Sequence, residues 1–282
     1  MQFALFGIVT GSILMVASVG FALVRQSENF FNVAHGQQAL FGAWLGYVFS
    51  REVGLPIWLA AIVAILLTAV LSVVISRVIY RPVASKGPTT LLFTSIGLAF
   101  FMYGAMYALM GNKPQSYDVP MLGLHRFFGA SITGLELVII GVSFTAVGLL
   151  HLFLTKTLAG KAIRAVATNE LLAQTVGIRT ARTSMYVWLW AGGFAGLAGV
   201  LWVSISSLNT EVGWSQIIIV LAAAVLGGTR SIYGVMVAGL ILGLAMDMSA
   251  LIIPSEYRFA MAFLMTIIVL LIKPGGISGE RA

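Results

Sequence analysis

The sequence predicts an all-α integral membrane protein, a polytopic helical bundle with about eight or nine spans, some of them broken or half-length. Two observations support this fold class. First, 60% of the 282 residues are hydrophobic and only 9% are charged, whereas a soluble domain carries roughly 25% charged residues. Second, the apolar residues fall into runs of about 20, and most charged residues lie in the gaps between them. Residues 1–282 are therefore expected to form a single transmembrane domain.

Nine apolar stretches follow one another along the chain. The first begins at Phe3 with no basic segment before it and exceeds the apolar core of a signal peptide, so we interpret it as a retained helix. The stretch 215–228 is short for a complete crossing and ends at Gly227-Gly228. The nine stretches cover residues 3–24, 31–49, 55–76, 89–110, 135–155, 183–203, 215–228, 232–250 and 258–273.

Four Gly-x-x-x-Gly pairs lie inside these stretches. Small residues one turn apart allow helix backbones to approach closely where lipid gives no hydrophobic drive for association. A single pair could mark a dimer face, but four pairs spread along the chain favour tight packing within one bundle. The pairs are Gly7/Gly11, Gly42/Gly46, Gly192/Gly196 and Gly239/Gly243.

The basic residues predict the orientation, because cytoplasmic loops of membrane proteins carry an excess of Lys and Arg. If 77–88 lies in the cytoplasm, alternation places twelve of the 16 basic residues there, with the N-terminus outside and the C-terminus in the cytoplasm. The net charge of +7 then reflects topology, and nucleic-acid binding is not expected. The cytoplasmic set is Arg25, Arg77, Arg81, Lys86, Lys156, Lys161, Arg164, Arg179, Arg182, Arg230, Lys273 and Arg281, and the outer set is Arg51, Lys113, Arg126 and Arg258.

The richest polar cluster within the apolar stretches runs from Asn32 to Gln38. On a helix, Asn32, His35 and Gln38 would share a face. Together with Gln37 they could line a hydrated passage for a polar solute, or they could form a buried network that ties helices together. The interruption before this cluster and the short stretch 215–228 are either broken helices beside a transport path or ordinary loops. A metal site is not expected, because His35 has no His or acidic residue three or four positions later.

No catalytic constellation appears in the sequence. It lacks Gly-x-Ser-x-Gly, His-Glu-x-x-His and the Gly-x-x-x-x-Gly-Lys-Ser/Thr loop that holds ATP phosphates. We therefore expect neither an enzyme nor an ATPase, and no cofactor or metal, in this chain. Glu136 and Asp247 lie near the expected outer ends of helices, where water would reach them, and this counts against a proton- or ion-driven carrier.

The longest expected cytoplasmic loop covers residues 156–182. Residues 162–173 are mostly good helix formers and Gly177 can end a helix, while Thr168 and Asn169 can start a new one. One or two short helices with exposed Arg164 and Glu170 are therefore expected. Such a helix could dock into a groove on a soluble partner, or it could lie on the membrane surface against anionic lipid.

Five short motifs are spread from one end of the chain to the other. They are Asn32-x-Ala34-His35-Gly36; Tyr80-Arg81-Pro82; Gly160-x-x-x-Arg164-Ala165-x-Ala167 followed by Ala173-x-x-x-Gly177-Ile178; Leu226-Gly227-Gly228-x-x-Ser231-Ile232-x-Gly234 with Gly239-Leu240-Ile241-Leu242-Gly243; and Pro274-x-Gly276-Ile277. In this order they resemble the branched-chain amino acid ABC permeases, specifically the shorter, high-affinity H-type subunit of that family.

The resemblance implies an importer in the inner membrane of a bacterium, in which two permease subunits, identical or different, form the pathway. Two cytosolic P-loop ATPases, which bind ATP and Mg²⁺, would dock on the permeases, and a periplasmic or surface-tethered binding protein would deliver the solute. By resemblance, the ATPase contact would lie within residues 164–177, at Arg164, Thr168, Asn169, Glu170 and Gly177.

The implied solute is a branched-chain or related small amino acid, imported on ATP hydrolysis by the partner ATPases. The same family also includes permeases for urea and short amides, and the neutral polar groups from Asn32 to Gln38 suit all of these solutes. The alternative from another class is a gradient-driven secondary transporter or a channel that acts alone. Bound ATPases would favour the importer, and dependence on a membrane gradient would favour the carrier.

Overall fold

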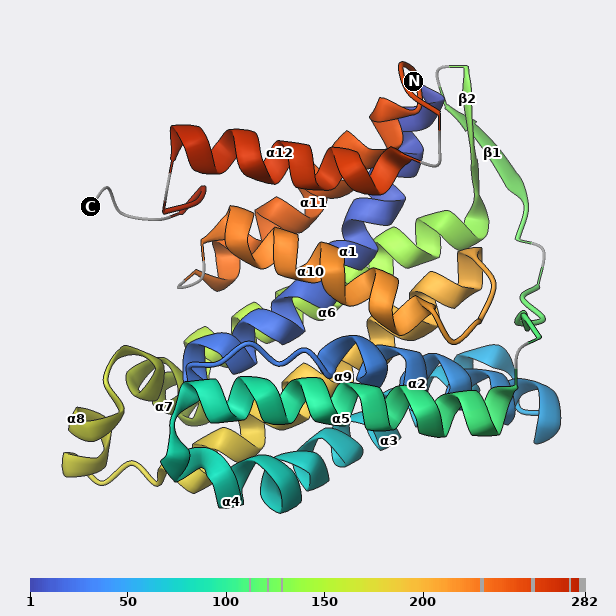
Figure 1. The fold of residues 1–282 in the computed structure, drawn as a ribbon. Coiled ribbons are helices and arrows are strands. Elements are labelled where there is room, and N and C mark those ends of the chain that lie inside the picture. The colour runs from blue at the N-terminus through green and yellow to red at the C-terminus, as the bar shows by residue number, and fades with distance from the viewer. Residues whose placement is uncertain are drawn as a thin grey trace.

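The computed structural model describes residues 1–111, 113–120, 122–127, 129–228, 231–254, 257–273 and 275–278, and Figure 1 shows their arrangement. Within these ranges the chain is mostly helical, with one two-stranded hairpin. Each predicted apolar stretch contains a helix, so the all-α membrane bundle is confirmed. Arg230 and Arg281 of the predicted cytoplasmic set and Pro274 of the last motif lie outside the described residues.

Six helices in the described part of the chain are long and apolar enough to cross a membrane. Their length follows from uninterrupted apolar runs, since about 20 residues span the hydrocarbon core of a bilayer. They are α1 (Gln2–Glu28), α3 (Ile57–Ile75) with its continuation through η2 (Ser76–Tyr80), α4 (Arg81–Val83) and η3 (Ala84–Lys86), α5 (Pro88–Met110), α6 (Gly134–Lys156), α9 (Thr180–Ile205) and α11 (Ile232–Ser249).

The remaining apolar helices are shorter. These are α2 (His35–Tyr47), which continues into the π-helical turn η1 (Val48–Glu52), α10 (Val212–Gly227) and α12 (Arg258–Ile272). Helix α10 has 16 residues, or about 24 Å, less than the roughly 30 Å of a bilayer core, as predicted for this part of the chain. Two further short helices, α7 (Leu158–Thr168) and α8 (Glu170–Thr175), connect α6 to α9 and project from one end of the bundle (Figure 1).

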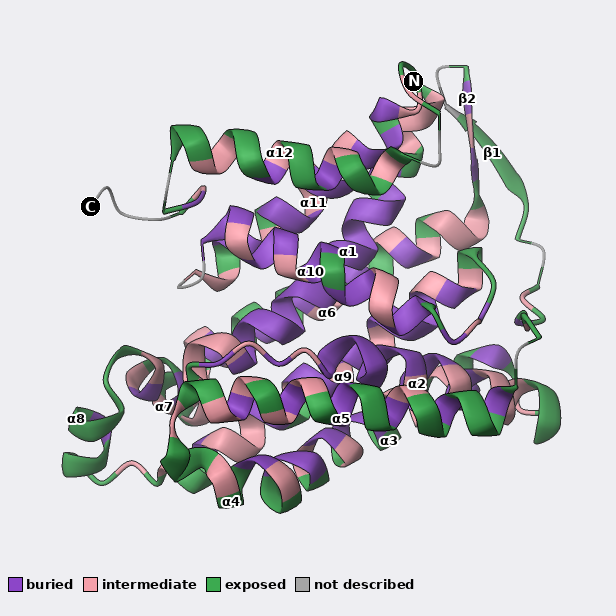
Figure 2. Ribbon diagram, viewed as in Figure 1, coloured by how far each residue is buried: buried purple, intermediate pink, exposed green. Residues whose placement is uncertain are grey.

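Helix α1 lies at the centre of the bundle, packed against α6, α9 and α11. In the most apolar 18-residue stretch of α1, 94% of the residues are buried, compared with 33% in that of α5 and 28% in that of α6. Figure 2 shows the same contrast, with α1 mostly buried and α5 presenting an exposed outer face. Because α5 and α6 are strongly apolar yet exposed, their outer faces suit contact with lipid or with another membrane protein.

Glycine allows α1 and α11 to pack closely. A Cβ atom on Gly243 would overlap the backbone of Gly11, and a Cβ atom on Gly7 would lie 2.8 Å from the Cα of Leu244. Each of the other predicted Gly-x-x-x-Gly pairs also meets a neighbouring segment within van der Waals distance. The prediction that these pairs serve packing within the bundle is confirmed.

At the end of the bundle remote from α7 and α8, the strands β1 (Leu124–Phe127) and β2 (Ala130–Thr133) form an antiparallel hairpin. The side chain of Gln2 ties the N-terminus to this hairpin, because it donates to the Ser131 carbonyl oxygen and accepts from the Ser131 N–H, both at 2.8 Å. Helix α6 then starts with a capping box in which Thr133 and Glu136 bind each other's backbone N–H groups.

The expectation that water reaches Asp247 is wrong. Asp247, near the end of α11, is buried, and its Oδ1 lies 3.0 Å from Nη2 of Arg258 at the start of α12. An unpaired buried carboxylate would be costly, and the ion pair between the two helices offsets that cost. Sequence position showed only that both residues lie near helix ends, and the pairing depends on how α12 folds back along α11.

Candidate functional site

A non-helical connection, residues 29–34, joins α1 to α2 inside the bundle. Helix α1 ends at Asn29, whose left-handed φ of 56° turns the chain, and the Arg25 side chain binds its Oδ1 at 2.7 Å. Further along, Ser95 of α5 binds this backbone: it accepts from the N–H of Val33 at 3.1 Å and lies 3.2 Å from the Phe31 carbonyl oxygen. The predicted interruption is therefore confirmed, and it is held in place by a side chain from another helix.

The four predicted path residues lie in the interior at the start of α2. Asn32, His35, Gln37 and Gln38 are each at most 1% exposed. The predicted shared helical face is wrong, because α2 begins at His35 and Asn32 precedes the helix. The non-helical connection of residues 29–34, instead of helical spacing, determines where Asn32 lies.

The polar atoms of these residues differ in their contacts. The Tyr80 hydroxyl of η2 donates to Asn32 Oδ1 at 2.8 Å, and His35 Nε2 lies 3.1 Å from the Ala17 carbonyl oxygen. Among the described residues, the side-chain amides of Gln37 and Gln38 have no hydrogen-bond partner. A buried polar group without a partner costs about 1–3 kcal/mol. Asn32 and His35 thus connect neighbouring segments, while the two glutamine amides leave polar groups for a solute, and the role of these residues in transport stays a prediction.

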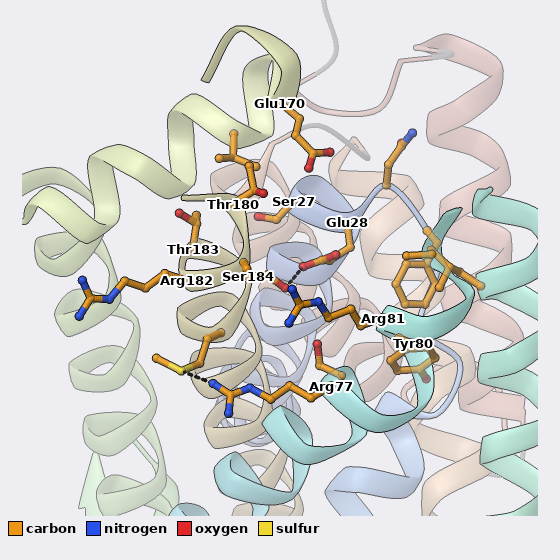
Figure 3. A pocket seen from close by; sticks show the side chains of 18 of the residues that line it. Ser27, Glu28, Arg77, Tyr80, Arg81, Glu170, Thr180, Arg182, Thr183 and Ser184 are labelled. Carbon is orange, nitrogen blue, oxygen red and sulfur yellow. Dashed lines mark hydrogen bonds between the residues drawn. The ribbon is translucent and has the colours of Figure 1, made fainter. Parts of the chain in front are cut away.

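A pocket of about 870 Å³ lies at the end of the bundle that carries α7 and α8 (Figure 3). Its walls come from the end of α1, from η2 and α4, from α7 and α8, and from the start of α9. The positive-inside pattern placed its arginines on one side of the membrane but gave no sign that they surround one pocket. The charged residues of the lining are Arg77, Arg81, Arg179, Arg182, Glu28 and Glu170.

Hydrogen bonds connect the walls of this pocket. The Ser184 hydroxyl of α9 donates to Glu28 at the end of α1, and Arg77 of η2 contacts the Met185 sulfur at 3.0 Å (Figure 3). Helices α1, α3 and α9 are therefore linked at the pocket, so a displacement of one of these helices would strain its contacts with the others.

Phe30, Tyr80 and Trp188 form an aromatic layer beside the pocket. The ring centroid of Tyr80 lies 5.1 Å from those of both Phe30 and Trp188, and all three side chains are buried. Tyr80 lines the pocket, while its hydroxyl binds Asn32 on the inner side. Tyr80 therefore connects the pocket to the predicted path residues. In the sequence it stood out only as the first residue of the Tyr-Arg-Pro motif.

The predicted long cytoplasmic loop folds as two short helices. Asn169 ends α7 and caps α8, since its Oδ1 accepts a hydrogen bond from the N–H of Leu172 at 3.0 Å. Beyond α8, Gly177 has a φ of 84°. Its N–H donates to the Gln174 carbonyl oxygen, and the N–H of Ile178 donates to that of Ala173. This is the Schellman arrangement that ends helices at glycine. The predicted cap and the predicted stop are both confirmed as local structure.

The residues predicted for partner contact lie on and around these two helices. Arg164 and Glu170 are exposed, as expected. The Thr168 hydroxyl donates a hydrogen bond to the Arg164 carbonyl oxygen at 2.9 Å, within the last turn of α7. Glu170 also lines the pocket, together with Val166 of α7. The structure thus brings the predicted contact segment and the pocket together, a relation that sequence spacing could not indicate.

Helix α8 presents an apolar surface outside the bundle. Leu171, Leu172 and Val176 are 76%, 62% and 70% exposed, whereas Ala173 is buried against the rest of the protein. A short, doubly capped helix with exposed Leu171 and Leu172, followed directly by exposed Val176, suits insertion into a groove on a partner. In the sequence, Arg164 and Glu170 stand out in this segment while the leucines do not, because apolar residues are common in membrane proteins.

Known proteins resemble this chain over almost its full length. The family model described as "Branched-chain amino acid transport system / permease component" matches residues 3–270. The high-affinity branched-chain amino acid transport system permease protein LivH of Escherichia coli (strain K12) is 30% identical over 97% of this chain and 94% of LivH. The permease protein BraD of Pseudomonas aeruginosa, which carries the same description, is 28% identical over the same shares.

A solved structure shares the fold. PsaBC from Streptococcus pneumoniae in complex with Fab superposes on the chain with a TM-score of 0.53 and 16% sequence identity. The match covers 98% of this chain and 93% of that chain. At this identity the similarity concerns the arrangement of helices.

Proposed function

This chain belongs to the branched-chain amino acid transport system permease family, and from this premise we propose that it is the membrane subunit of an ATP-driven importer of branched-chain or related small amino acids. The chain is a multi-pass membrane permease. Its partners in the proposal are a second permease subunit, two cytosolic P-loop ATPases that hold ATP and Mg²⁺, and a solute-binding protein on the other side of a bacterial inner membrane.

The observation that carries the proposal is the exposed apolar surface of α8 beside the pocket. A partner that binds Leu171, Leu172 and Val176 would hold α8, and Glu170 at the start of the same helix lines the pocket. Movement of the partner would therefore change the wall of the pocket. An ATPase acts on a permease by binding one conformation more tightly than another, so a docking helix that forms part of the pathway mouth suits this coupling.

The proposed path runs from the pocket through the aromatic layer to the buried polar residues. Tyr80 takes part in all three, because it lines the pocket, packs on Phe30 and Trp188, and binds Asn32. Beyond it lie His35, Gln37 and Gln38. Their neutral side chains can bind a polar solute more weakly than an opposite charge would, so that the solute can leave again. In this proposal the aromatic layer closes the path when the pocket is open to the cytoplasm.

The test combines purification of the complex with transport. The chain is isolated in mild detergent from its native membrane, and its partners are identified by mass spectrometry. We expect P-loop ATPases to copurify with the wild type and to be lost when Leu171 and Leu172 are both changed to Glu. Val53→Glu serves as the matched control, because Val53 is 57% exposed at the opposite end of the bundle.

Uptake of L-leucine into vesicles with the purified complex in their membrane, ATP inside and the binding protein outside completes the test. We expect ATP-dependent uptake that disappears when residues 164–177 are deleted. Recovery of the chain alone in several detergents, with uptake that follows an ion gradient instead of ATP, would show a carrier and refute the importer. Uptake that survives the deletion would remove the coupling role of this segment.

A further inference from the structure

A carboxylate lies beside a cluster of aromatic rings where α5 meets the start of α10. Glu211 precedes the first residue of α10, and its Oε1 accepts a hydrogen bond from the Tyr103 hydroxyl of α5 at 2.7 Å. The ring of Trp214 lies 4.9 Å from that of Phe100 and 6.3 Å from that of Tyr103, between ring centroids. Tyr107 extends the aromatic surface, with its centroid 6.5 Å from that of Tyr103.

The depth of this cluster is its unusual feature. Tyr103 lies about 10 Å from Met110, the end of α5 remote from the pocket, so Glu211 is below the outer end of a membrane-spanning helix. Glu211 is nevertheless exposed on the surface of the bundle, and it forms no ion pair within the described part of the chain. An exposed carboxylate at membrane depth is costly against hydrocarbon, and such groups in membrane proteins face water-filled cavities or partners.

The interior behind the cluster is also polar. Gly213 lies between Glu211 and the body of α10, and a Cβ atom there would lie only 2.6 Å from Oε1 of Gln37. The buried Gln37 amide, which has no hydrogen-bond partner among the described residues, is therefore adjacent to the first turn of α10. The cluster and the predicted path residues occupy two sides of the same turn.

The chemistry of the cluster selects a cation. Glu211 accepts one hydrogen bond in the described structure, and a carboxylate has room for further donors. Phe100, Tyr103, Tyr107 and Trp214 supply the ring faces that attract ammonium groups, and their apolar surface suits an alkyl side chain. A substrate that carries an ammonium group next to a branched alkyl chain would satisfy both parts.

We propose that this face of α5 and α10 forms a wall of the water-filled pathway and that Glu211, with the surrounding rings, binds the ammonium group of the amino acid as it passes. The inference rests on the proposed function for the identity of the substrate. It adds a site that lies on the outer surface of one subunit, where a second permease subunit would close the pathway. This site would distinguish amino acids from urea and neutral amides, which lack the positive charge.

The experiment uses the chain isolated from its native membrane together with its partners, in lipid nanodiscs, and the probe isopentylamine, an alkyl ammonium with the branched side chain but no carboxylate. Saturation-transfer NMR measures its contact with the protein, and 4-methylpentanoate, which lacks the ammonium group, serves as the second probe. We expect the amine signal to fall at least about fivefold in Glu211→Gln and Trp214→Leu, because a charge-assisted bond or a ring face is lost. Glu211→Asp, which keeps the charge, should restore part of the signal.

Asp118→Asn is the matched control, because Asp118 is an exposed carboxylate outside the cluster that pairs with Arg51 at 3.2 Å. A Glu211→Gln chain that keeps the wild-type elution profile and the wild-type amine signal would overturn the inference, as would equal signals from both probes. Amine binding that depends on Glu211 in a chain that fails to import L-leucine would leave the site standing and refute the proposed substrate. Import of L-leucine without Glu211-dependent amine binding would refute the site and leave the proposed substrate standing.

Discussion

Single residues connect parts of this protein that are far apart in the sequence, and Tyr80 is the clearest case. It follows the third apolar stretch, yet its hydroxyl binds Asn32 from the second, and its ring packs on Trp188 from the sixth. Because the Asn32 amide oxygen is buried, the hydroxyl both positions the non-helical connection and satisfies an acceptor that water does not reach freely.

Tyr80→Phe is expected to lower the free energy of unfolding by about 1–3 kcal/mol, because it leaves the Asn32 oxygen without its donor while the aromatic packing stays. The measurement is the midpoint of thermal unfolding of the purified chain in detergent. Tyr257→Phe is the control, since Tyr257 is 60% exposed. Equal midpoints for the two variants would show that the hydrogen bond contributes nothing.

Ion pairs at the residue scale follow the same principle. Sequence position places Asp247 near the outer end of a helix and Arg258 among the basic residues of the outer side, and the structure pairs them where Asp247 is buried. A sequence displays the two charges but not the packing of α12 on α11 that brings them to 3.0 Å. The rule that buried charges are paired predicts that a partner exists without identifying it.

At the scale of helices, glycine determines which elements can cross closely. The crossing of α1 and α11 brings Gly11 and Gly243 into backbone contact. By contrast, Gly148 on the exposed face of α6 has open space where a side chain would point. The same residue type therefore has opposite tolerance in two membrane helices.

Gly11→Leu is expected to destabilise the bundle by about 3 kcal/mol or more, since the overlap involves backbone that cannot move aside. Gly148→Leu introduces the same residue toward lipid and should keep the wild-type amount of folded protein. Size-exclusion chromatography of the detergent extracts compares the two variants. A normal monodisperse peak for Gly11→Leu would contradict the close crossing of α1 and α11.

The helices α7 and α8 show how much local sequence can specify. A capping Asn169 and a terminating Gly177 define α8 without help from the rest of the protein, which is why both signals could be read in advance. The contact of α8 with the pocket through Glu170 is different, because it depends on where α1, η2 and α9 lie.

At the scale of the whole molecule, the orientation follows from the distribution of charge. The four pocket arginines, Arg77, Arg81, Arg179 and Arg182, lie at the end of the bundle that carries α7 and α8. The positive-inside rule therefore predicts that this end faces the cytoplasm and that the hairpin of β1 and β2 faces outward. The orientation stays a prediction that labelling can test directly.

The chain contains no cysteine, so single cysteines can be introduced without removing others. A membrane-impermeant maleimide should label Asp118→Cys in intact spheroplasts and should label Gln174→Cys only after the membrane is opened. Both positions are exposed, so accessibility within the protein does not limit the reaction. The reverse pattern would invert the topology and place α8 out of reach of a cytosolic ATPase.

The sequence alone predicted the membrane class, the order of the helices, the short α10 and the two signals that shape α8. These features depend on local properties, namely apolar run length, charge placement and capping residues, which each segment carries within itself. The candidate residues Asn32, His35, Gln37 and Gln38 were also found this way, because polar groups stand out against an apolar background. Their role in transport stays a prediction.

The tertiary structure decided which residues meet. The pocket of arginines, the layer of Phe30, Tyr80 and Trp188, and the cluster around Glu211 each combine side chains from helices that are distant along the chain. In an apolar sequence such residues look like ordinary loop charges or lipid-facing aromatics. Helix crossings set by close glycine packing and the non-helical segment 29–34 determine these contacts. The Gly-x-x-x-Gly pairs show in the sequence that some helices pack closely, but not which helices meet.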